Sequence, residues 1–319
     1  MTEIRHRTVP ANGLQLRIAE AGEGPLVLLL HGFPESWYSW RHQLVALAEA
    51  GFHAVAPNQR GYPGTGGPAA VEDYTILHLV GDAVALIEAL GESTATVVGH
   101  DWGAPVAWHT ALLRPDVVRG VAALSVPYSK RSPTPTLTGL RSRFGDNFYQ
   151  LYFQQPGVAE AGFEADLDRA FRRSLVGLSG DSPHIRPLVV PEGGGFADIW
   201  PAPEKLPSWL TEQDIGAYVR EYAGTSLTGP LNWYRNIDRN WALTAAWETA
   251  KITPPALMLA GDRDPVISWF DPVRLEASMR SVISDLRGFR LLPGAGHWVQ
   301  QERPEEINAA LVDFAGATS

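Results

Sequence analysis

The sequence contains no cysteine among its 319 residues. Disulfide bonds, thiolate metal sites and cysteine nucleophiles are therefore excluded. The absence of disulfides fits a reducing compartment, and we expect a cytoplasmic protein. Long hydrophobic runs are also missing, since the longest strongly apolar stretch, Leu26 to Leu30, is far too short to span a bilayer. Residues Met1 to Asn12 contain no apolar run either, so we expect no signal peptide and no membrane partner.

Positive charge is scarce in this chain. There are 26 Lys and Arg residues against 35 Asp and Glu residues, which gives a net charge of -9. Such an acidic balance argues against a nucleic acid as a partner. Hydrophobic residues make up 45% of the chain, so a sizeable core can be buried. Nothing in the composition decides between a monomer and a homodimer, and both states stay open.

Predicted strands and helices alternate in the first part of the chain and again near its end. The predicted strands are Leu14 to Ala19 as an edge strand, Leu26 to Leu30, Phe52 to Ala56, Ala95 to Val98, Val117 to Leu124, Ala256 to Ala260 and Phe289 to Leu292. The predicted helices are Trp40 to Glu49, Ile76 to Leu90, Trp102 to Leu113, Val273 to Met279 and Pro304 to Phe314. This alternation predicts an α/β fold with a mainly parallel sheet covered by helices on both faces.

The segment between these two parts has a different pattern. From residue 128 to residue 247 no strand signal recurs, and the sequence is aromatic and helical in character. Two stretches within it, Ser132 to Thr136 and Ser179 to Pro203, have the composition of loops. We therefore expect a core made of residues 1–127 and 248–319 and a helical cap domain made of residues 128–247. The cap should lie over the carboxyl ends of the strands, where ligands bind in such sheets.

The pentapeptide Gly99 to Gly103 follows a predicted buried strand and precedes a predicted helix. It has the form small-x-nucleophile-x-small that is typical of a nucleophile elbow, a tight turn that presents one side chain to a pocket. Asp101 occupies the nucleophile position, where serine is more usual. The alternative interpretation is a structural turn with a capping aspartate, which the two flanking glycines make less attractive.

An aspartate at this position favours a particular chemistry. A carboxylate is a weak acyl nucleophile, because its attack gives an anhydride that collapses back to the reactants. The same carboxylate can displace a leaving group from saturated carbon and form an alkyl ester. Water must then attack the ester carbonyl with the help of a general base and an oxyanion hole. The substrates that fit are epoxides and alkyl halides.

The partners of Asp101 are expected at the ends of later strands. His297 follows the strand that ends at Leu292, and we expect it to activate the water. Asp264 follows the strand that ends at Ala260, and we expect it to orient the imidazole ring. Asp262 is the alternative, and we favour Asp264 because it is further from the strand.

An oxyanion hole is expected beside the nucleophile. Its predicted donors are the backbone N–H groups of Phe33, in the loop after an early strand, and of Trp102, directly after Asp101. Pro34 could hold a fixed cis peptide bond at Phe33. His31 and His100 are expected to be structural.

With these residues in place, the chain resembles an epoxide hydrolase of the α/β-hydrolase fold over nearly its whole length. Two further motifs support the resemblance, residues 148–157 and residues 229–236. Each motif of that family contributes a tyrosine that hydrogen-bonds the epoxide oxygen, and the matching residues here are Tyr149 and Tyr234. A phenol with a reference pKa of about 10 can donate to the alkoxide that ring opening creates. The spacing alone leaves Tyr152 equal to Tyr149, and only the resemblance separates them.

Two other functions remain as alternatives at this stage. A haloalkane dehalogenase would use the same Asp and His, but its counterpart of Phe33 is commonly Asn, and the two tyrosine motifs would have no role in releasing halide. A ligand receptor without activity would have no need for an intact triad. The resemblance implies neither a metal nor an organic cofactor, and it implies a small apolar epoxide and water as the substrates.

Overall fold

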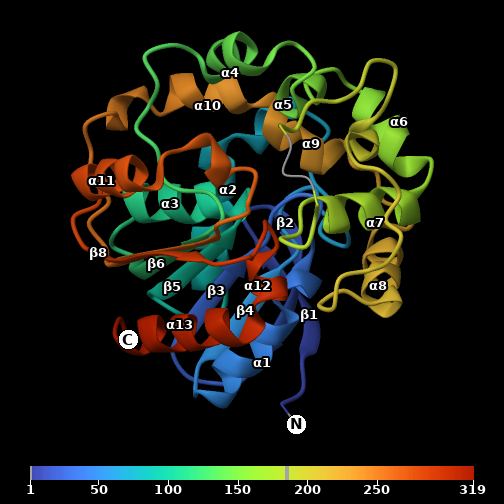
Figure 1. Cartoon of the computed structure of the whole chain (residues 1–319). Coiled ribbons are helices and arrows are strands. Elements are labelled where there is room, and N and C mark those ends of the chain that lie inside the picture. Colours follow the sequence, from blue (N-terminus) through green and yellow to red (C-terminus); the bar gives the residue numbers. More distant parts are fainter. Residues whose placement is uncertain (1, 184–186) are drawn as a thin grey trace.

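The computed structural model describes residues 2–183 and 187–319 of the chain. Within them, eight strands form one sheet in the order β1-β2-β4-β3-β5-β6-β7-β8 (Figure 1). From β4 to β8 neighbouring strands run parallel, whereas β1 and β2 join antiparallel. The strands are β1 Arg5–Ala11, β2 Leu14–Ala21, β3 Leu26–Leu30, β4 His53–Pro57, β5 Ala95–His100, β6 Val118–Leu124, β7 Ala256–Gly261 and β8 Leu286–Leu292.

One strand prediction was wrong in its position. The strand that begins at Leu14 is not at the edge of the sheet, because β1 pairs with it along its full length, from Arg5 opposite Glu20 to Ala11 opposite Leu14. The sequence pattern missed β1 because its first four residues are exposed and only Val9 and Ala11 are buried. The other predicted strands of the sheet are confirmed to within two or three residues at their ends.

Helices cover both faces of the sheet because the central strands bury both of their faces. In β3 the side chains of Leu26, Leu28 and Leu30 join one apolar cluster, and those of Val27 and Leu29 join another. The first cluster also holds apolar residues of α2 Ile76–Ala89 and α3 Gly103–Leu113, and the second those of α1 Arg41–Glu49 and α13 Pro304–Gly316. Pro304 is the first residue of α13, as predicted.

The chain between β6 and β7 forms helices that gather along the top and right of Figure 1. These helices are α4 Thr136–Phe144, α5 Tyr149–Tyr152, α6 Val158–Glu164, α7 Leu167–Gly177, α8 Glu212–Tyr222, α9 Thr228–Arg235 and α10 Ile237–Leu243, with the 3₁₀ turns η3 Phe196–Ile199 and η4 Ala245–Trp247. We refer to them as the cap helices. Part of the predicted loop from Ser179 to Pro203 lies outside the described residues, and η3 interrupts the rest of it.

Polar contacts attach the cap helices to the core. The Tyr222 hydroxyl donates to the carbonyl oxygen of Glu35 at 2.7 Å, and the Trp233 indole N–H donates to that of Arg60 at 3.0 Å. Arg41 of α1 forms a salt bridge with Asp214 of α8 at 3.0 Å. The remaining elements lie outside the segment between β6 and β7 and are η1 Trp37–Trp40, η2 Val71–Tyr74, η5 Ile267–Trp269, α11 Pro272–Val282 and α12 Val299–Glu302.

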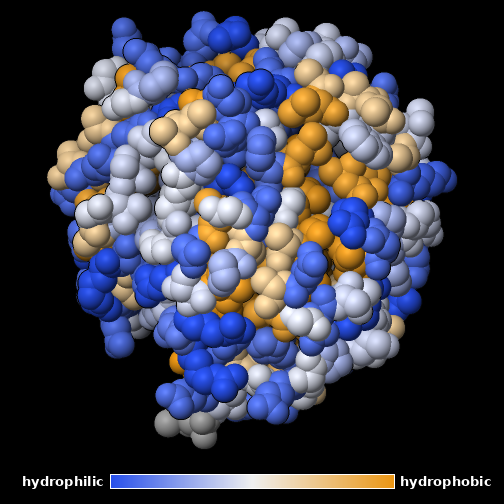
Figure 2. All heavy atoms as spheres, turned by 180° about the vertical axis from the view of Figure 1, so that it is seen from behind, coloured by the Kyte–Doolittle hydropathy of each residue, from blue (hydrophilic) through white to orange (hydrophobic). Residues whose placement is uncertain are grey.

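The surface behind the view of Figure 1 carries a band of apolar side chains between charged ones (Figure 2). Among the described residues, the most exposed large hydrophobic side chain is Val273, at 78%, while Leu77, Leu243 and Trp247 are each exposed by slightly more than a third. No helix in residues 2–183 and 187–319 combines the length and the apolar character needed to cross a membrane.

Candidate active site

Asp101 lies at a sharp bend between β5 and α3. Its φ of 48° is in the left-handed region, which is uncommon for a residue with a side chain. The bend is possible because its neighbours are glycines. A Cβ atom on Gly99 would lie 2.0 Å from the carbonyl oxygen of Gly103, and one on Gly103 would lie 1.9 Å from that of Leu30. The elbow geometry predicted from the pentapeptide is therefore present.

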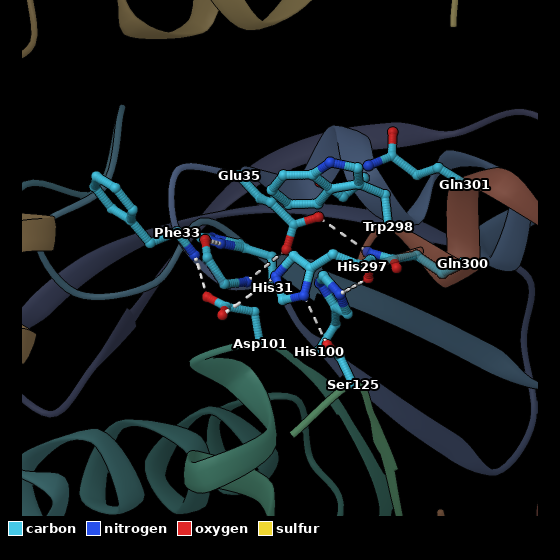
Figure 3. Close-up of polar contacts among 12 residues, drawn as sticks. His31, Phe33, Glu35, His100, Asp101, Ser125, His297, Trp298, Gln300 and Gln301 are labelled. Atoms are coloured by element: carbon cyan, nitrogen blue, oxygen red, sulfur yellow. Dashed lines mark hydrogen bonds and ion pairs between the residues drawn. The ribbon is translucent and has the colours of Figure 1, made fainter. Parts of the chain in front are cut away.

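The two oxygens of the Asp101 carboxylate have different partners (Figure 3). The backbone N–H of Phe33 donates to Oδ1 at 2.8 Å, and Nε2 of His297 lies 3.4 Å from Oδ2. The side chain is buried, with 8% of the residue exposed. Burial raises the pKa of Asp101, but His297 and the Phe33 amide outweigh it and leave the pKa below its usual value. The carboxylate is therefore ionised at neutral pH.

The imidazole of His297 lies between two carboxylates. Its Nδ1 is 3.2 Å from both oxygens of Asp264, on the side opposite to Asp101. Burial lowers the pKa of His297, yet the charges and hydrogen bonds of Asp264 and Asp101 raise it well above the usual value. The three side chains predicted from the ends of β5, β7 and β8 therefore meet at one edge of the sheet.

Asp264 is fully buried, and Asp262 is not. The Oδ1 atom of Asp264 accepts a hydrogen bond from the Val266 backbone N–H at 2.8 Å. Asp262 is exposed and accepts from the Gly294 backbone N–H at 2.8 Å, so it supports the turn after β8 instead. Of the two candidates, only Asp264 contacts the histidine.

Two residues of the site were missed by the sequence reasoning. Ser125, directly after β6, contacts both His297 and Asp264 through its hydroxyl. Glu35 is a buried carboxylate whose Oε2 accepts from the Gly32 backbone N–H at 2.9 Å and lies 2.6 Å from Nδ1 of His100. The only available signal was position, since Ser125 ends a strand like the triad residues and Glu35 follows the predicted oxyanion loop.

The loop from His31 to Pro34 lies against the elbow. The Phe33–Pro34 peptide bond is cis. His31 is fully buried, burial lowers its pKa to about 4, and its Nε2 accepts from the Gln59 backbone N–H at 3.2 Å. Nε2 of His100 lies 2.7 Å from the carbonyl oxygen of His297. Both histidines therefore hold backbone in place, in keeping with the expected structural roles.

Tyr149 and Tyr234 approach the elbow from the cap helices. Their ring centroids are 5.9 Å apart, and the Tyr234 ring lies edge-on to Trp102 at 5.2 Å. Both rings are buried, and burial raises the pKa of each phenol above its usual value, so both stay neutral and can donate a proton. The side-chain amide of Gln150 donates to the Tyr149 hydroxyl at 2.9 Å.

Tyr152 faces a different part of the cap. It is partly exposed, and its pKa is raised by partial burial and, to a lesser extent, by the carboxylates of Asp198 and Glu160. Tyr149 lines the cavity beside Asp101, whereas neither Tyr152 nor Tyr234 is among the described residues that line it. Position therefore separates two tyrosines that spacing alone left equal.

A cavity of about 420 Å³ opens beside the elbow. Asp101, Trp102 and Tyr149 line it where the core meets the cap helices. Most of its other walls are apolar or aromatic, and they include Trp108, Leu112, Tyr128, Ile237, Trp241 and Trp269. Lys130, Arg131 and Glu248 supply its charged groups. The described residues contain no cluster of three or more His, Asp or Glu side chains that could hold a metal ion.

Comparison with known proteins first shows to which class of protein the chain belongs. A family model described as alpha/beta hydrolase fold matches residues 25–304. The elbow then identifies a hydrolase of this fold that presents a carboxylate where serine is usual.

Three relatives narrow the class. Epoxide hydrolase A of Mycobacterium tuberculosis is 47% identical over 313 residues, which cover 97% of this chain and 96% of that protein. The solved structure of an epoxide hydrolase from an endophytic Streptomyces is 45% identical, with a TM-score of 0.93 over 98% of this chain and 96% of that one. Epoxide hydrolase A from Mycobacterium thermoresistibile is 49% identical, with a TM-score of 0.90 over 98% of each chain. The chain belongs to the epoxide hydrolases of the alpha/beta hydrolase fold, which act on an ether bond.

Proposed function

We propose that this epoxide hydrolase works through a covalent ester on Asp101. In the first step Oδ2 of Asp101 attacks one carbon of the epoxide, and the bond from that carbon to the ring oxygen breaks. Tyr149 and Tyr234 donate hydrogen bonds to the ring oxygen, and one of them gives it a proton. The observation that carries this proposal is the Asp101 carboxylate itself, which is ionised, held at Oδ1 by an amide, and open to the cavity.

In the second step His297 takes a proton from a water molecule, which attacks the carboxyl carbon of the ester. The bond from that carbon to the ester oxygen breaks, and the His297 imidazolium gives its proton to the departing oxygen, so that the diol leaves with an oxygen that belonged to Asp101. The proton left on the new carboxyl group returns to the phenolate formed in the first step, which restores the phenol and the Asp101 carboxylate. Asp264 holds the imidazole and stabilises the imidazolium. The contacts at Nδ1 and Nε2 support this assignment, because they direct one nitrogen to each carboxylate.

The backbone N–H groups of Phe33 and Trp102 form the oxyanion hole in this proposal. Phe33 already donates to Oδ1 of Asp101, the atom that becomes the ester carbonyl oxygen and then the oxyanion. Trp102 follows Asp101 directly in the chain, and we assign its N–H as the second donor. The cis Phe33–Pro34 peptide belongs to this loop.

We propose apolar epoxides as the substrates and the cap helices as the wall that selects them. The aromatic and aliphatic walls of the cavity favour an apolar group attached to the epoxide, and its volume suits a small molecule. In this interpretation residues 1–127 and 248–319 supply Asp101, Asp264 and His297, and residues 128–247 supply the phenols and most of the pocket.

A single turnover in ¹⁸O-water, with enzyme in excess over epoxide, tests the covalent route. We expect the first diol to be unlabelled and Asp101 to gain the label, because the new oxygen of the diol comes from the protein. Mass spectrometry of the diol and of the peptide that contains Asp101 measures both. Label in the first diol would mean direct attack by water and would end the proposal.

We also propose a homodimer and a cytoplasmic location, and both are independent of the reaction mechanism. Sedimentation velocity at micromolar protein concentration tests the first, and a single monomeric species would contradict it. Cell fractionation tests the second, and recovery with membranes or outside the cell would contradict it.

A further inference from the structure

Ser125 has a backbone conformation that costs free energy. Its φ is 74°, and the N–H of Val126 donates to the carbonyl oxygen of Leu124 at 2.9 Å. Together these features describe a γ-turn with positive φ, which is rare and strained for a residue with a side chain. The turn directly follows β6, and the N–H of Ser125 donates to the Leu259 carbonyl oxygen of β7 at 2.9 Å.

The turn brings the Ser125 hydroxyl between two members of the triad. The residue is fully buried, and its Oγ donates a hydrogen bond to Oδ2 of Asp264. The same Oγ lies 2.8 Å from Nδ1 of His297, which is closer to that nitrogen than either oxygen of Asp264, at 3.2 Å. Figure 3 shows Ser125 at the side of the His297 ring that faces away from Asp101.

Counting protons assigns the role of each atom. A hydroxyl has one hydrogen, and Ser125 uses it toward Asp264, so its oxygen can only accept from His297. Nδ1 of His297 must therefore carry a proton. In the neutral imidazole the lone pair then lies on Nε2, the nitrogen nearest to Asp101. A water molecule between Nε2 and the ester would meet the basic nitrogen.

We propose that Ser125 is a positioning residue for the hydrolysis step, which fixes the tautomer and tilt of His297 together with Asp264. This inference rests on the covalent route proposed above. It deepens that route, because it makes the contact from His297 to Asp264 run partly through a serine hydroxyl. The strain at Ser125 fits this role, since strained backbone persists where the surroundings need one side chain in a particular place.

The test separates the two chemical steps. Enzyme in excess is mixed with epoxide and quenched over time, and mass spectrometry follows formation and loss of the ester on Asp101. For S125A we expect ester formation at the rate of the unchanged enzyme and hydrolysis slowed by about tenfold to a hundredfold, because a hydrogen bond to a charged pair is lost. The ester should therefore accumulate in S125A.

Two further variants remove the alternative explanations. S125G also lacks the hydroxyl but relieves the strain of the positive φ. It should therefore hydrolyse the ester as slowly as S125A but have a higher melting temperature than S125A. S174A is the matched control, because Ser174 is also fully buried and its hydroxyl donates only to carbonyl oxygens of its own helix, at 2.7 Å to Ala170 and 3.3 Å to Phe171. It should leave both rates unchanged.

A spectroscopic measurement tests the tautomer itself. The ¹⁵N chemical shifts of His297 should report a protonated Nδ1 in the neutral ring of the unchanged enzyme and a mixture of tautomers in S125A. Hydrolysis of the S125A ester at the normal rate, or an unchanged tautomer, would overturn the role of Ser125. Absence of any ester in the unchanged enzyme would instead overturn the covalent route, so the two failures are distinct.

Discussion

The core side and the cap side of the active site are built on different physical principles. On the core side, Asp101, Asp264 and His297 are ionisable groups whose polar atoms are held by hydrogen bonds at the ends of strands. On the cap side, Tyr149 and Tyr234 are neutral phenols held mainly by ring contacts. Charge is therefore placed by directional bonds on the rigid sheet, and neutral proton donors are placed by aromatic packing on the cap helices.

The same contrast extends to the residues behind each side. Glu35 ties the oxyanion loop to the core through Gly32, His100 and Gln300, all within 2.9 Å. Tyr234 instead lies edge-on to the rings of Phe33 and Phe153, at 5.5 and 4.9 Å. Aromatic contacts have a broad energy minimum, whereas hydrogen bonds fail over short displacements. The orientation of Tyr234 is therefore fixed by less directional contacts than that of the loop around Gly32.

The largest effect should follow from removing Asp101, the proposed nucleophile. D101A removes the carboxylate that lies at the elbow and lines the cavity, and we expect turnover to fall by at least about 10⁴-fold, as for nucleophiles in comparable triads. No covalent adduct should form in excess enzyme. Rates from diol formation and intact-protein mass spectra measure this. Residual turnover at a hundredth of the normal rate would mean that the core side does not supply the nucleophile.

The cap side should show the next largest effect, and in the other step. We expect Y149F and Y234F each to slow ester formation, and the double variant to abolish it, because a general acid commonly contributes about 10²-fold to 10⁴-fold. Hydrolysis of an ester already formed should be unaffected. Y152F is the matched control, since Tyr152 is partly exposed and has Asp198 and Glu160, not Asp101, as its charged neighbours. Epoxide opening by the double variant would refute the role of the phenols.

A smaller effect should distinguish the two aspartates after β7. D264N keeps the shape but removes the charge that holds His297, and we expect hydrolysis of the ester to slow by about a hundredfold. D262N should change this rate little, because Asp262 is exposed and contacts only the turn at Gly294. Stopped-flow measurement of ester decay provides both rates. Equal effects of the two substitutions would reassign the acid.

The core side was also easier to predict from the sequence than the cap side. Gly99 and Gly103 around Asp101 have one steric explanation, which the structure bears out through the approach of backbone atoms to both glycines. Strand ends then indicated His297 and Asp264, because the carboxyl ends of parallel strands meet at one edge. No comparable rule applies to a cap helix, so the choice of Tyr149 over Tyr152 came only from the resemblance.

The sequence did not reveal the role of the small residue Ser125 or the presence of the polar edge strand β1. Ser125 has no motif around it, and its position depends on a backbone angle that the sequence does not encode locally. The strand β1 was missed because buried and exposed residues alternate only near its end, where Val9 and Ala11 are buried. Both cases depend on partners distant in the chain, Asp264 for the serine and β2 for the strand.

The smallest expected effect is a shift in pH dependence, which tests how the two sides share charge. In the free enzyme the negative charges of Asp264 and Asp101 raise the pKa of His297 well above its usual value. Once Asp101 is an uncharged ester, one of these two charges is gone, so the pKa of His297 should fall. In the proposed route neutral His297 is the base, and hydrolysis should therefore rise with pH through this lower pKa.

Two measurements compare the pKa of His297 in the intermediate with that in the free enzyme. The pH profile of ester decay in single turnovers gives the pKa of His297 in the intermediate, and NMR titration of the free enzyme gives the higher one. D101N serves as a control, because its neutral amide has the same charge as the ester and should lower the pKa of His297 in the free protein.

The raised pKa of His297 also affects the stability of the fold. Protonated His297 stabilises the folded state at pH values below its unfolded pKa of about 6.5, and this contribution is lost as the pH rises through the folded pKa. Equal pKa values in the free enzyme, the intermediate and D101N would show that Asp101 does not set the basicity of His297, and the charge coupling on the core side would have to come from Asp264 alone.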